Sequence, residues 1–434
     1  MKTIKEPHEK VKAVLYAKHP TSETGWRLAH WVVTFSAGGV NLMKHTLSGE
    51  IIRLTDEEFA APENLEELRK RRYVVPKDYN EAEQYTQTIK LIKLMQRETP
   101  GLKTYTILPT TACNARCTYC YEEGFDIITM TPETVERLID FICETRQEDK
   151  IHITWFGGEP LVCSKAIGHV SRTLEERGVP FKATVVTNAS LFTPELVREA
   201  KEVWKTEIVQ VSLDGEKSDY TARKRFIDPV RYNYETVMRS IQLLAEADIK
   251  VQLRVNFDRS SLPKMQSFLD EIKERFGKYP NVKMYLYMLF QQQHMGNCVD
   301  VYREMFDLYG RNKGNDMLMV ANSKGKLKLN MCMADSLDKS IVIGPDGKLY
   351  ECENLSRNNS WGNIFDGVTD EEKLKQLKEP AKVEPECADC PYLPECTPFF
   401  RRRCPDHFEY CREYNELKTE YALRGIAEKE LEND

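Results

Sequence analysis

Residues 113–121 read Cys-Asn-Ala-Arg-Cys-Thr-Tyr-Cys-Tyr, and the interpretation of the whole chain starts from this run. Its cysteines, Cys113, Cys117 and Cys120, are separated by three and then by two residues. Thiolates this close can hold three corners of a cubane 4Fe–4S cluster, because thiolate is the ligand that such clusters take. The run offers no fourth cysteine, so one iron would stay open to bind a small molecule. Zinc is the alternative, but zinc motifs usually pair two close ligands with two distant ones, so the spacing favours iron–sulfur.

The overall composition excludes several classes of function. The chain has 434 residues, enough for roughly two to four domains. A net charge of −6 gives no electrostatic basis for binding nucleic acid or an anionic membrane. No apolar stretch approaches the roughly 20 residues of a membrane span, and residues 1–10 lack the apolar core of a signal peptide. We therefore expect a cytoplasmic protein.

Thirteen cysteines in a reducing compartment need an explanation other than disulfides. Ten of them fall into two groups, within residues 113–120 and 332–411. The other three, Cys143, Cys163 and Cys298, are more typical of small apolar residues in a core. Cys298 is also a candidate hydrogen-donor thiol.

Three segments differ in their pattern. Residues 1–98 predict a small α+β module, with alternating strands up to Leu54, a polar-faced helix over Asp56–Arg72 and a long amphipathic helix over Tyr79–Arg97. Residues 99–312 alternate between apolar strands and helical patterns. Residues 313–434 are rich in cysteine and poor in long apolar runs, so their folding is expected to depend on bound metal.

The middle segment repeats its strand–helix unit about six times, which predicts an α/β fold with a parallel sheet. Several helical patterns open with Thr-Pro or Leu-Pro, as helix N-termini do. The pattern alone leaves open whether the sheet is a partial barrel or an open, doubly wound sheet. The expected strands are Tyr105–Pro109, His152–Phe156, Ala183–Thr187, Ile208–Leu213, Val251–Phe257 and Met284–Phe290.

Polar signals lie at the carboxyl ends of these strands, which is where ligands bind in parallel α/β folds. Any one of them is weak, but five in register beside a cysteine run are a strong indication. In order they are the cysteine run, Gly157-Gly158-Glu159-Pro160, Thr187-Asn188, Ser212-Leu213-Asp214-Gly215 and Arg254-Val255-Asn256.

On these motifs, residues 104–290 resemble the core of the radical S-adenosylmethionine (SAM) enzymes. That family is marked by C-x3-C-x-aromatic-C, here with Tyr119 as the aromatic, and by Gly-Gly-Glu-Pro. The resemblance implies a partial (βα)6 TIM-like barrel and a cluster whose open iron chelates the amino and carboxylate groups of SAM. Reduction would then cleave SAM to methionine and a 5′-deoxyadenosyl radical.

The resemblance also implies roles for individual residues. The motif from Gly157 to Pro160, with Glu159, would meet the methionine amino group, and Tyr119 would lie near the adenine. Ser212 and Asp214 would lie near the ribose or carboxylate, and Thr187 with Asn188 would complete the SAM site. Arg254 would pair with the carboxylate, with Arg223 as the competing candidate. Relatives usually read Thr-Asn-Gly where this chain has Ala189, which is a departure in the local backbone.

The C-terminal cysteines are similar to the SPASM extension of radical SAM peptide-modifying enzymes, which carries two auxiliary 4Fe–4S clusters; zinc sites are the alternative. The chain departs from that pattern by placing seven residues, ending in three arginines, between Cys396 and Cys404. It also lacks an additional cysteine soon after Cys332, which would leave an open iron on the first auxiliary cluster. The implied ligands are Cys332, Cys352 and Cys404 for the first auxiliary cluster, and Cys387, Cys390, Cys396 and Cys411 for the second.

Residues 11–95 loosely resemble the winged-helix-like element with which such enzymes bind a leader peptide as an added strand; a scaffold role is the alternative. The sequence thus predicts a radical SAM maturase of a ribosomally made precursor peptide, forming thioethers, with an electron donor such as flavodoxin or ferredoxin. Carbon–carbon crosslinking, epimerisation and sulfatase-type oxidation of Cys or Ser are rival chemistries. A non-catalytic iron–sulfur electron carrier is the alternative from a different class.

Overall fold

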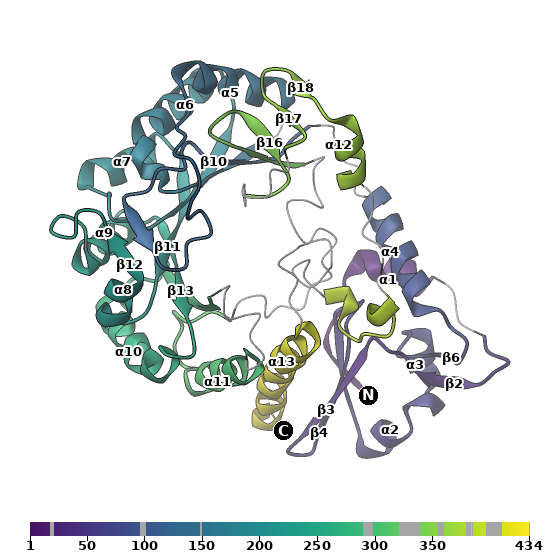
Figure 1. Ribbon diagram of the computed structural model, residues 1–434. Helices are drawn as coiled ribbons and strands as arrows, with labels where there is room; N and C mark the ends of the chain where they lie inside the picture. The colour runs from purple at the N-terminus through teal and green to yellow at the C-terminus, as the bar shows by residue number, and fades with distance from the viewer. Residues whose placement is uncertain are drawn as a thin grey trace. The chain divides into compact units, whose positions relative to one another are not determined.

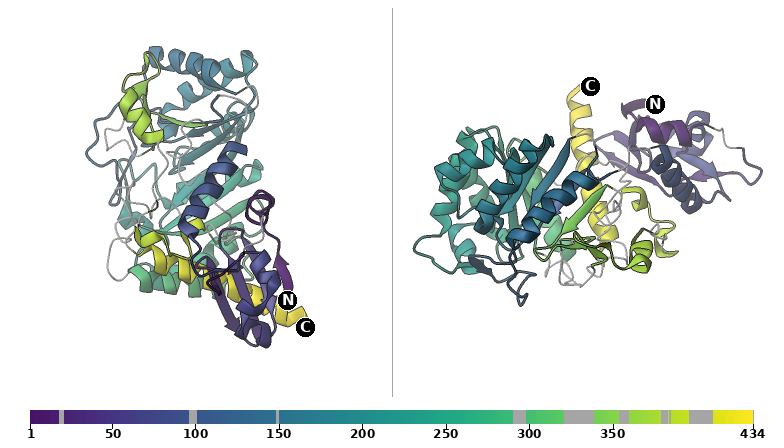
Figure 2. Two further views of the ribbon diagram at one scale, coloured as in Figure 1. Left: turned by 90° about the vertical axis from the view of Figure 1, so that its right-hand side faces the viewer. Right: turned by 90° about the horizontal axis from the view of Figure 1, so that it is seen from above.

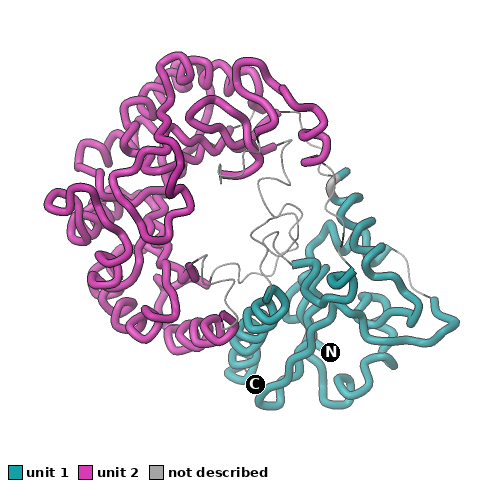
Figure 3. Tube along the Cα trace, viewed as in Figure 1, with its two compact units in different colours: residues 1–98, 322–331, 380–434 teal, residues 99–321, 332–379 magenta. Residues whose placement is uncertain are grey.

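The computed structural model divides the chain into two compact units (Figure 3). The terminal unit comprises residues 1–98, 322–331 and 380–434, and the barrel unit comprises residues 99–321 and 332–379. The expected third segment, 313–434, is shared between them. No helix among the residues described below is long and apolar enough to cross a membrane. The structure describes residues 1–17, 21–95, 101–147, 150–289, 298–320, 339–353, 360–378, 383, 385–395 and 410–433.

The barrel unit is built on a sheet in which six neighbouring strands are parallel, in the order β14-β13-β11-β10-β9-β7 with β14 at the edge. The six strands curve into a partial barrel (Figure 1), as the resemblance implied. Each expected strand is present, with bounds shifted by one or two residues. They are β7 Thr104–Ile107, β9 Ile151–Trp155, β10 Phe181–Thr187, β11 Thr206–Leu213, β13 Lys250–Phe257 and β14 Val282–Met288.

Helices cover the outer face of this sheet (Figure 2). Strand residues alternate accordingly: Ile151, Ile153 and Trp155 are buried, whereas His152 and Thr154 are only partly so. The helices begin where the sequence predicts, because threonine hydroxyls cap α5 and α7 and proline occupies the first turn of each. The helices are α5 Pro132–Thr145, α6 Ser164–Glu176, α7 Pro194–Glu202, α8 Lys217–Arg223, α9 Tyr234–Glu246, α10 Met265–Phe276 and α11 Cys298–Arg311.

Part of the cysteine-rich segment extends the barrel sheet. Strand β15, Ser340–Ile343, runs parallel to β7, and three short antiparallel strands follow it. Cys352 comes directly after the first of these strands. These short elements are β16 Lys348–Tyr350, β17 Gly362–Asn363 and β18 Gly367–Val368, followed by α12 Glu371–Lys378.

The terminal unit contains an antiparallel sheet in the order β1-β5-β4-β3, with β3 and β1 at its edges. Its core includes the C-terminal helix α13, Cys411–Asn433, whose Leu423 and Ala427 pack against residues of β4 and β5. A second small sheet pairs β2 with β6. The bounds are β1 Lys2–Lys5, α1 Glu9–Leu15, β2 Trp26–Leu28, β3 Val32–Ala37, β4 Val40–His45, β5 Glu50–Leu54, β6 Val74–Pro76 and α4 Glu81–Met95.

The prediction of one continuous helix over Asp56–Arg72 was wrong, because the segment is divided into three short helical elements. It consists of α2 Asp56–Ala60, a single 3-10 turn Pro62–Asn64 and α3 Glu66–Lys70. The cause is Pro62, which disfavours helical geometry at the residue before it: Ala61 has φ −139° and ψ 62°.

Candidate active site

The loop that carries the cysteine run is fixed by a two-stranded ribbon. Strand β8, Ala115–Cys117, pairs antiparallel with β12, Lys224–Phe226, so that Cys117 lies opposite Lys224. Beyond the ribbon, the Thr118 amide donates to the Arg223 carbonyl at 2.9 Å. Cys113 and Cys117 are partly buried, and Cys120 is exposed. The three expected ligands therefore lie on one restrained loop at the end of β7.

The surroundings of the three thiols disfavour their ionisation. Burial, with the Glu159 charge next, raises the pKa of Cys113 to about 12, and burial raises that of Cys117 to about 11. Burial raises the pKa of Cys120 as well. The charges of Cys117 and Cys120 add to the rise at Cys113, and the charge of Cys120 adds to the rise at Cys117. Thiolates at these positions require nearby positive charge, which bound iron supplies. Within the described ranges, no three His, Cys, Asp or Glu side chains are placed to hold a single metal ion; a cubane instead takes its thiolates at separate irons.

The Gly-Gly-Glu-Pro motif packs directly on the backbone that precedes Cys113. The Gly158 amide donates to the Thr110 carbonyl at 3.1 Å, and the Glu159 amide donates to the Ala112 carbonyl at 2.9 Å. A Cβ atom at Gly157 would lie 2.4 Å from the Thr110 carbonyl oxygen, and one at Gly158 would lie 2.5 Å from that of Ala112. Both glycines are therefore required by close backbone approach, and Gly157 also has φ +112°.

The Glu159 carboxylate joins the ends of the second and third barrel strands. It is completely buried and accepts hydrogen bonds from the Thr187 hydroxyl at 2.6 Å and from the amides of Asn188 and Leu161 at 2.8 and 3.1 Å. Burial raises its pKa. In this structure the carboxylate is an anchor between strands, and the backbone around it remains for contacts to a ligand.

Asn188 connects that anchor to the cysteine loop. Its amide nitrogen donates to the Asn114 side chain at 2.9 Å, and Asn114 in turn donates to the Ser190 hydroxyl at 2.9 Å. Ala189, the departure noted above, lies in the left-handed region at φ +61°, where glycine is normally preferred. Its amide donates to the Thr187 hydroxyl at 2.9 Å, so local hydrogen bonding holds this conformation.

A second buried network ties the loop to the fourth and fifth strands. The Tyr119 hydroxyl lies 2.7 and 2.8 Å from the two oxygens of Asp214, and Asn256 donates to the same carboxylate at 2.8 Å. The Lys224 ammonium is 3.6 Å from Asp214 and donates to the Ser212 carbonyl at 2.8 Å. Burial by itself would lower the pKa of Lys224, but nearby negative charge, chiefly that of Asp214, raises this pKa well above its usual value. Asp214 thus anchors the cysteine loop, and its carboxylate is enclosed.

The two arginines proposed for a carboxylate differ in their surroundings. Arg223 pairs with Asp258 at 2.7 Å and donates to the Asp214 carbonyl at 3.3 Å. The Arg254 guanidinium lies 3.8 Å from the centre of the Tyr287 ring, and its Nε has no hydrogen-bond partner in the described part of the chain. Arg254 is therefore the cation better placed to receive a ligand carboxylate.

Hydrogen bonds thus connect the cysteine loop with the expected site residues at the ends of the second, third and fourth barrel strands. Pro160 begins the short helix that follows Glu159. Sequence reasoning missed Asn114 and Lys224 and gave Asn256 no role. Lys224 carried no sequence signal, because its burial depends on the pairing of two strands that lie far apart in the chain.

The auxiliary cysteines are described only in part. Cys387, Cys390 and Cys411 lie in the terminal unit. Burial, followed by the charges of Cys390 and Cys387, raises the pKa of Cys411 to about 11. Cys352, in the barrel unit, lies 3.4 Å from a carboxylate oxygen of Glu353. Cys298 is buried in α11. The other three expected ligands, Cys332, Cys396 and Cys404, lie outside the described residues.

Comparisons with known proteins agree with this geometry. Residues 107–262 match the model of the Radical SAM superfamily. The chain is 26% identical over 176 residues to Fe-coproporphyrin III synthase of Methanosarcina barkeri, a match that spans 41% of this chain and 42% of that protein. It thus covers less than half the length of that relative.

Two solved structures share the fold over most of the chain. Native anSMEcpe with bound AdoMet and Cp18Cys peptide has a TM-score of 0.58 at 17% identity, covering 75% of this chain and 98% of that one. Streptococcus suis SuiB bound to the precursor peptide SuiA has a TM-score of 0.53 at 13% identity, covering 89% and 99%. At these identities the likeness concerns the fold. The superfamily match and the restrained three-cysteine loop at the barrel edge both fall within residues 107–262, and they assign this part of the chain to the Radical SAM superfamily.

Proposed function

We propose that the chain matures a ribosomally synthesised precursor peptide and that it installs thioether crosslinks at peptide cysteines. One observation supports the radical reaction. Hydrogen bonds hold the cysteine loop against the Gly-Gly-Glu-Pro motif, and that motif against Thr187-Asn188 at the end of the next strand. The peptide substrate is supported by the likeness to folds solved with bound peptides.

Cys113, Cys117 and Cys120 would hold a 4Fe–4S cluster that, when bound and reduced, supplies the electron for cleaving SAM into methionine and a 5′-deoxyadenosyl radical. The backbone at Gly157 and Gly158 would meet the SAM amino group, because neither residue has a side chain in the way. Arg254, stacked on Tyr287, would pair with its carboxylate. Tyr119 is hydrogen-bonded in place and would border the adenine.

Polar side chains on the inner face of the barrel suit a peptide backbone. Gln210 lies opposite Gln252 in the ladder, and the Tyr285 hydroxyl donates to Gln210 at 3.2 Å. All three side chains are partly exposed. Amide and phenol groups can donate to and accept from peptide groups without requiring a charged substrate.

The C-terminal cysteines would bind two auxiliary 4Fe–4S clusters, the first through Cys332, Cys352 and Cys404. With only three protein ligands, that cluster would keep an open iron for a substrate thiolate, which is the reason for preferring thioether formation. In the terminal unit, a leader peptide would add as a strand to the edge strand β3.

Cleavage of SAM tests the radical reaction. Reconstituted protein is incubated with SAM and dithionite, and 5′-deoxyadenosine is quantified by chromatography. Cys117→Ala is expected to abolish its formation, while Cys143→Ala, outside both cysteine groups, leaves it unchanged. Fully iron- and sulfide-loaded protein that forms no 5′-deoxyadenosine would instead be an electron carrier.

The crosslink is tested with a precursor peptide encoded beside the gene. A thioether product retains the peptide cysteine's sulfur, resists alkylation and lacks two hydrogen atoms per crosslink. A product with alkylatable cysteines and the same loss of hydrogen would indicate carbon–carbon crosslinking. A mass that is unchanged in ordinary water but rises by one unit per modified residue in deuterium oxide would indicate epimerisation. Conversion of Cys or Ser to an aldehyde would indicate sulfatase-type chemistry.

A further inference from the structure

Two arginines face each other on the outer side of the ribbon that holds the cysteine loop. Arg116 and Arg225 are direct partners in the β8–β12 ladder. Strand alternation turns Lys224 and Phe226 inward, where both are buried, and leaves Arg225 exposed together with Arg116. Arg116 is adjacent to Cys117 in the chain, and it donates to the Cys113 carbonyl at 2.8 Å.

This arrangement sets two positive charges opposite each other in the ladder. Like charges directly opposite each other in a ladder are destabilising. Neither Arg116 nor Arg225 forms an ion pair with a described carboxylate. Two guanidinium groups side by side, in a chain whose net charge is −6, point to a negatively charged binding partner.

The loop after β12 extends the same surface with apolar and basic residues. Ile227 is 63% exposed and Val230 is 90% exposed, and Arg231 is exposed beside them. The Ile227 amide donates to the Asn114 carbonyl at 2.9 Å, which joins this loop to the cysteine loop. Asp228 is the acidic residue of the loop, and its carboxylate accepts from the Arg231 amide at 3.1 Å.

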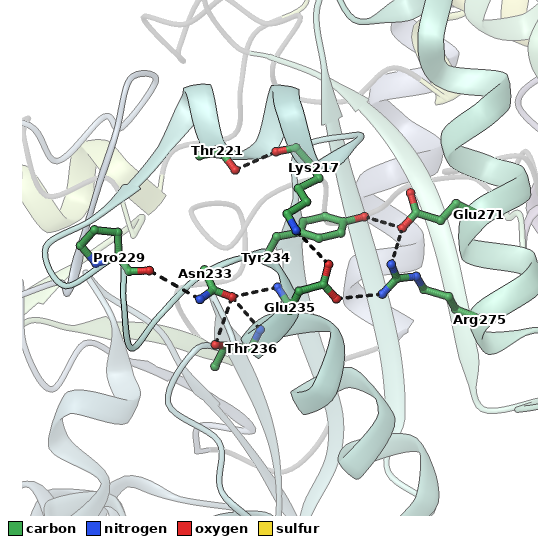
Figure 4. A network of polar contacts seen from close by, with 9 residues as sticks. All are labelled: Lys217, Thr221, Pro229, Asn233, Tyr234, Glu235, Thr236, Glu271 and Arg275. Carbon is green, nitrogen blue, oxygen red and sulfur yellow. Dashed lines mark hydrogen bonds and ion pairs between the residues drawn. The ribbon is translucent and has the colours of Figure 1, made fainter.

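Asn233 and the ion pairs beyond it hold this loop in place (Figure 4). The Asn233 side chain donates to the Pro229 carbonyl at 3.5 Å and accepts from the Glu235 amide at 3.1 Å, which caps α9. Glu235 in turn pairs with Lys217 and Arg275, each at 3.3 Å, and so links α9 to α8 and α10. A surface fixed in this way loses little entropy on binding a partner.

We propose that this surface, defined by Arg116, Arg225, Ile227, Val230 and Arg231 and here called the arginine face, docks an acidic one-electron donor protein. The inference rests on the proposed function, in which each SAM cleavage needs one electron from outside. The donor is oxidised by one electron and the cluster held by Cys113, Cys117 and Cys120 is reduced by the same electron. Arginines around a few exposed apolar side chains suit a small, transient redox interface, and they steer an acidic donor toward a chain that would otherwise repel it.

The test compares a protein donor with a small reductant on the same reconstituted enzyme. The variant is Arg225→Glu/Arg231→Glu, because neither side chain contacts the cysteine loop through a hydrogen bond in the described part of the chain. With reduced flavodoxin as the donor, we expect the initial rate of 5′-deoxyadenosine formation to fall about tenfold or more, since steering changes association rates by about 10–1,000-fold. With dithionite the rate is expected to stay at the wild-type value.

A matched control carries the same change of charge elsewhere. Arg198→Glu/Arg239→Glu reverses two exposed arginines on α7 and α9 and should leave both rates unchanged. The flavodoxin rate of the wild type should fall as salt increases, whereas that of the variant should be nearly flat. A flavodoxin whose surface carboxylates are replaced by lysines should restore the rate of the variant.

The results separate failure of this inference from failure of the proposed function. Wild-type protein that forms no 5′-deoxyadenosine with dithionite would overturn the proposed function. Normal dithionite activity with equal flavodoxin rates in wild type and variant would overturn only the arginine face. A variant that loses the dithionite rate as well would show that these arginines act on the cluster site itself, which also overturns the docking role.

Discussion

At the residue scale, the glycines of the Gly-Gly-Glu-Pro motif are set by backbone contacts. Gly157→Ala would place a methyl group 2.4 Å from the Thr110 carbonyl oxygen in a backbone conformation that alanine rarely adopts. We expect the substitution to lower the free energy of unfolding by roughly 3 kcal/mol and to weaken cluster retention, because β9 must then move away from the cysteine loop. Urea unfolding and iron content measure the two effects.

Gly178→Ala is the matched control for this prediction. Gly178 also has positive φ, at +70°, but a Cβ atom there would meet nothing within 4 Å. Its substitution is therefore expected to cost only about 1 kcal/mol and to leave the iron content unchanged. Equal costs at Gly157 and Gly178 would show that backbone conformation alone, and not contact with the loop, decides the Gly157 position.

A buried histidine makes the terminal unit sensitive to acid. His45 is completely buried, and burial lowers its pKa from 6.5 to about 4. Between these values the unfolded state binds a proton that the native state does not, so the free energy of unfolding falls as the pH is lowered from 6.5 toward 4. The loss reaches roughly 3 kcal/mol.

Amide hydrogen exchange in β4 at pH 7.5 and pH 5, corrected for the intrinsic pH dependence of exchange, checks this expectation. Protection should fall at pH 5 in the wild type and much less in His45→Gln. His8→Gln, which alters an exposed histidine, should behave like the wild type. An unchanged pH dependence in His45→Gln would assign the acid sensitivity to other groups.

At the element scale, the β8–β12 ribbon depends on a buried ion pair that only the fold creates. Lys224→Met would leave Asp214 without its ammonium partner in a fully buried site. We expect a loss of about 3–5 kcal/mol in the free energy of unfolding. Lys224→Met/Asp214→Asn should recover part of it, because the uncompensated charge is then gone.

A double-mutant cycle measured by urea unfolding gives the coupling between the two residues. Lys217→Met serves as the control, since it removes an exposed pair with Glu235 and should cost under about 1 kcal/mol. If Lys224→Met cost no more than this control, the pair would not support the ribbon.

Elements with local sequence signals were predicted well, and those without were not. The capped helices α5 and α7 and the six alternating strands were confirmed, because hydrophobic periodicity and capping residues act within each element. The β8–β12 ribbon was not foreseen, since three-residue strands carry no periodicity and pair over more than 100 residues of chain.

At the scale of the whole molecule, the cysteine-rich segment is divided between the two units. In the terminal unit, Leu393 joins the core formed by Val11, Trp31 and Leu47, with Cys387 and Cys390 packed against it. The Lys44 ammonium pairs with Glu395 at 2.7 Å, and both side chains are buried. Cys387 and Cys390, two of the cysteines expected to hold the second auxiliary cluster, therefore lie in a segment that belongs to the core of the N-terminal module.

We predict that Cys387→Ala/Cys390→Ala removes one cluster, lowering iron from about twelve to about eight atoms per chain, as expected for cubanes of four irons. Amide exchange should increase around Thr46, which donates to the Pro391 carbonyl at 2.6 Å, because folding of this segment is coupled to its metal. Cys143→Ala/Cys163→Ala should retain all the iron. Zinc bound to the wild-type protein in place of this iron would contradict the auxiliary-cluster assignment.

The radical SAM core could be predicted from the sequence alone, because the cysteine spacing, the Gly-Gly-Glu-Pro motif and the strand–helix alternation are each visible within a short stretch of chain. The tertiary structure decided what lies between them. It enclosed the Glu159 and Asp214 carboxylates in hydrogen bonds from other strands and loops, placed Lys224 beside Cys117 and set Arg116 opposite Arg225. Such relations depend on which distant strands pair and which side chains lose water, and no local pattern in the chain encodes either.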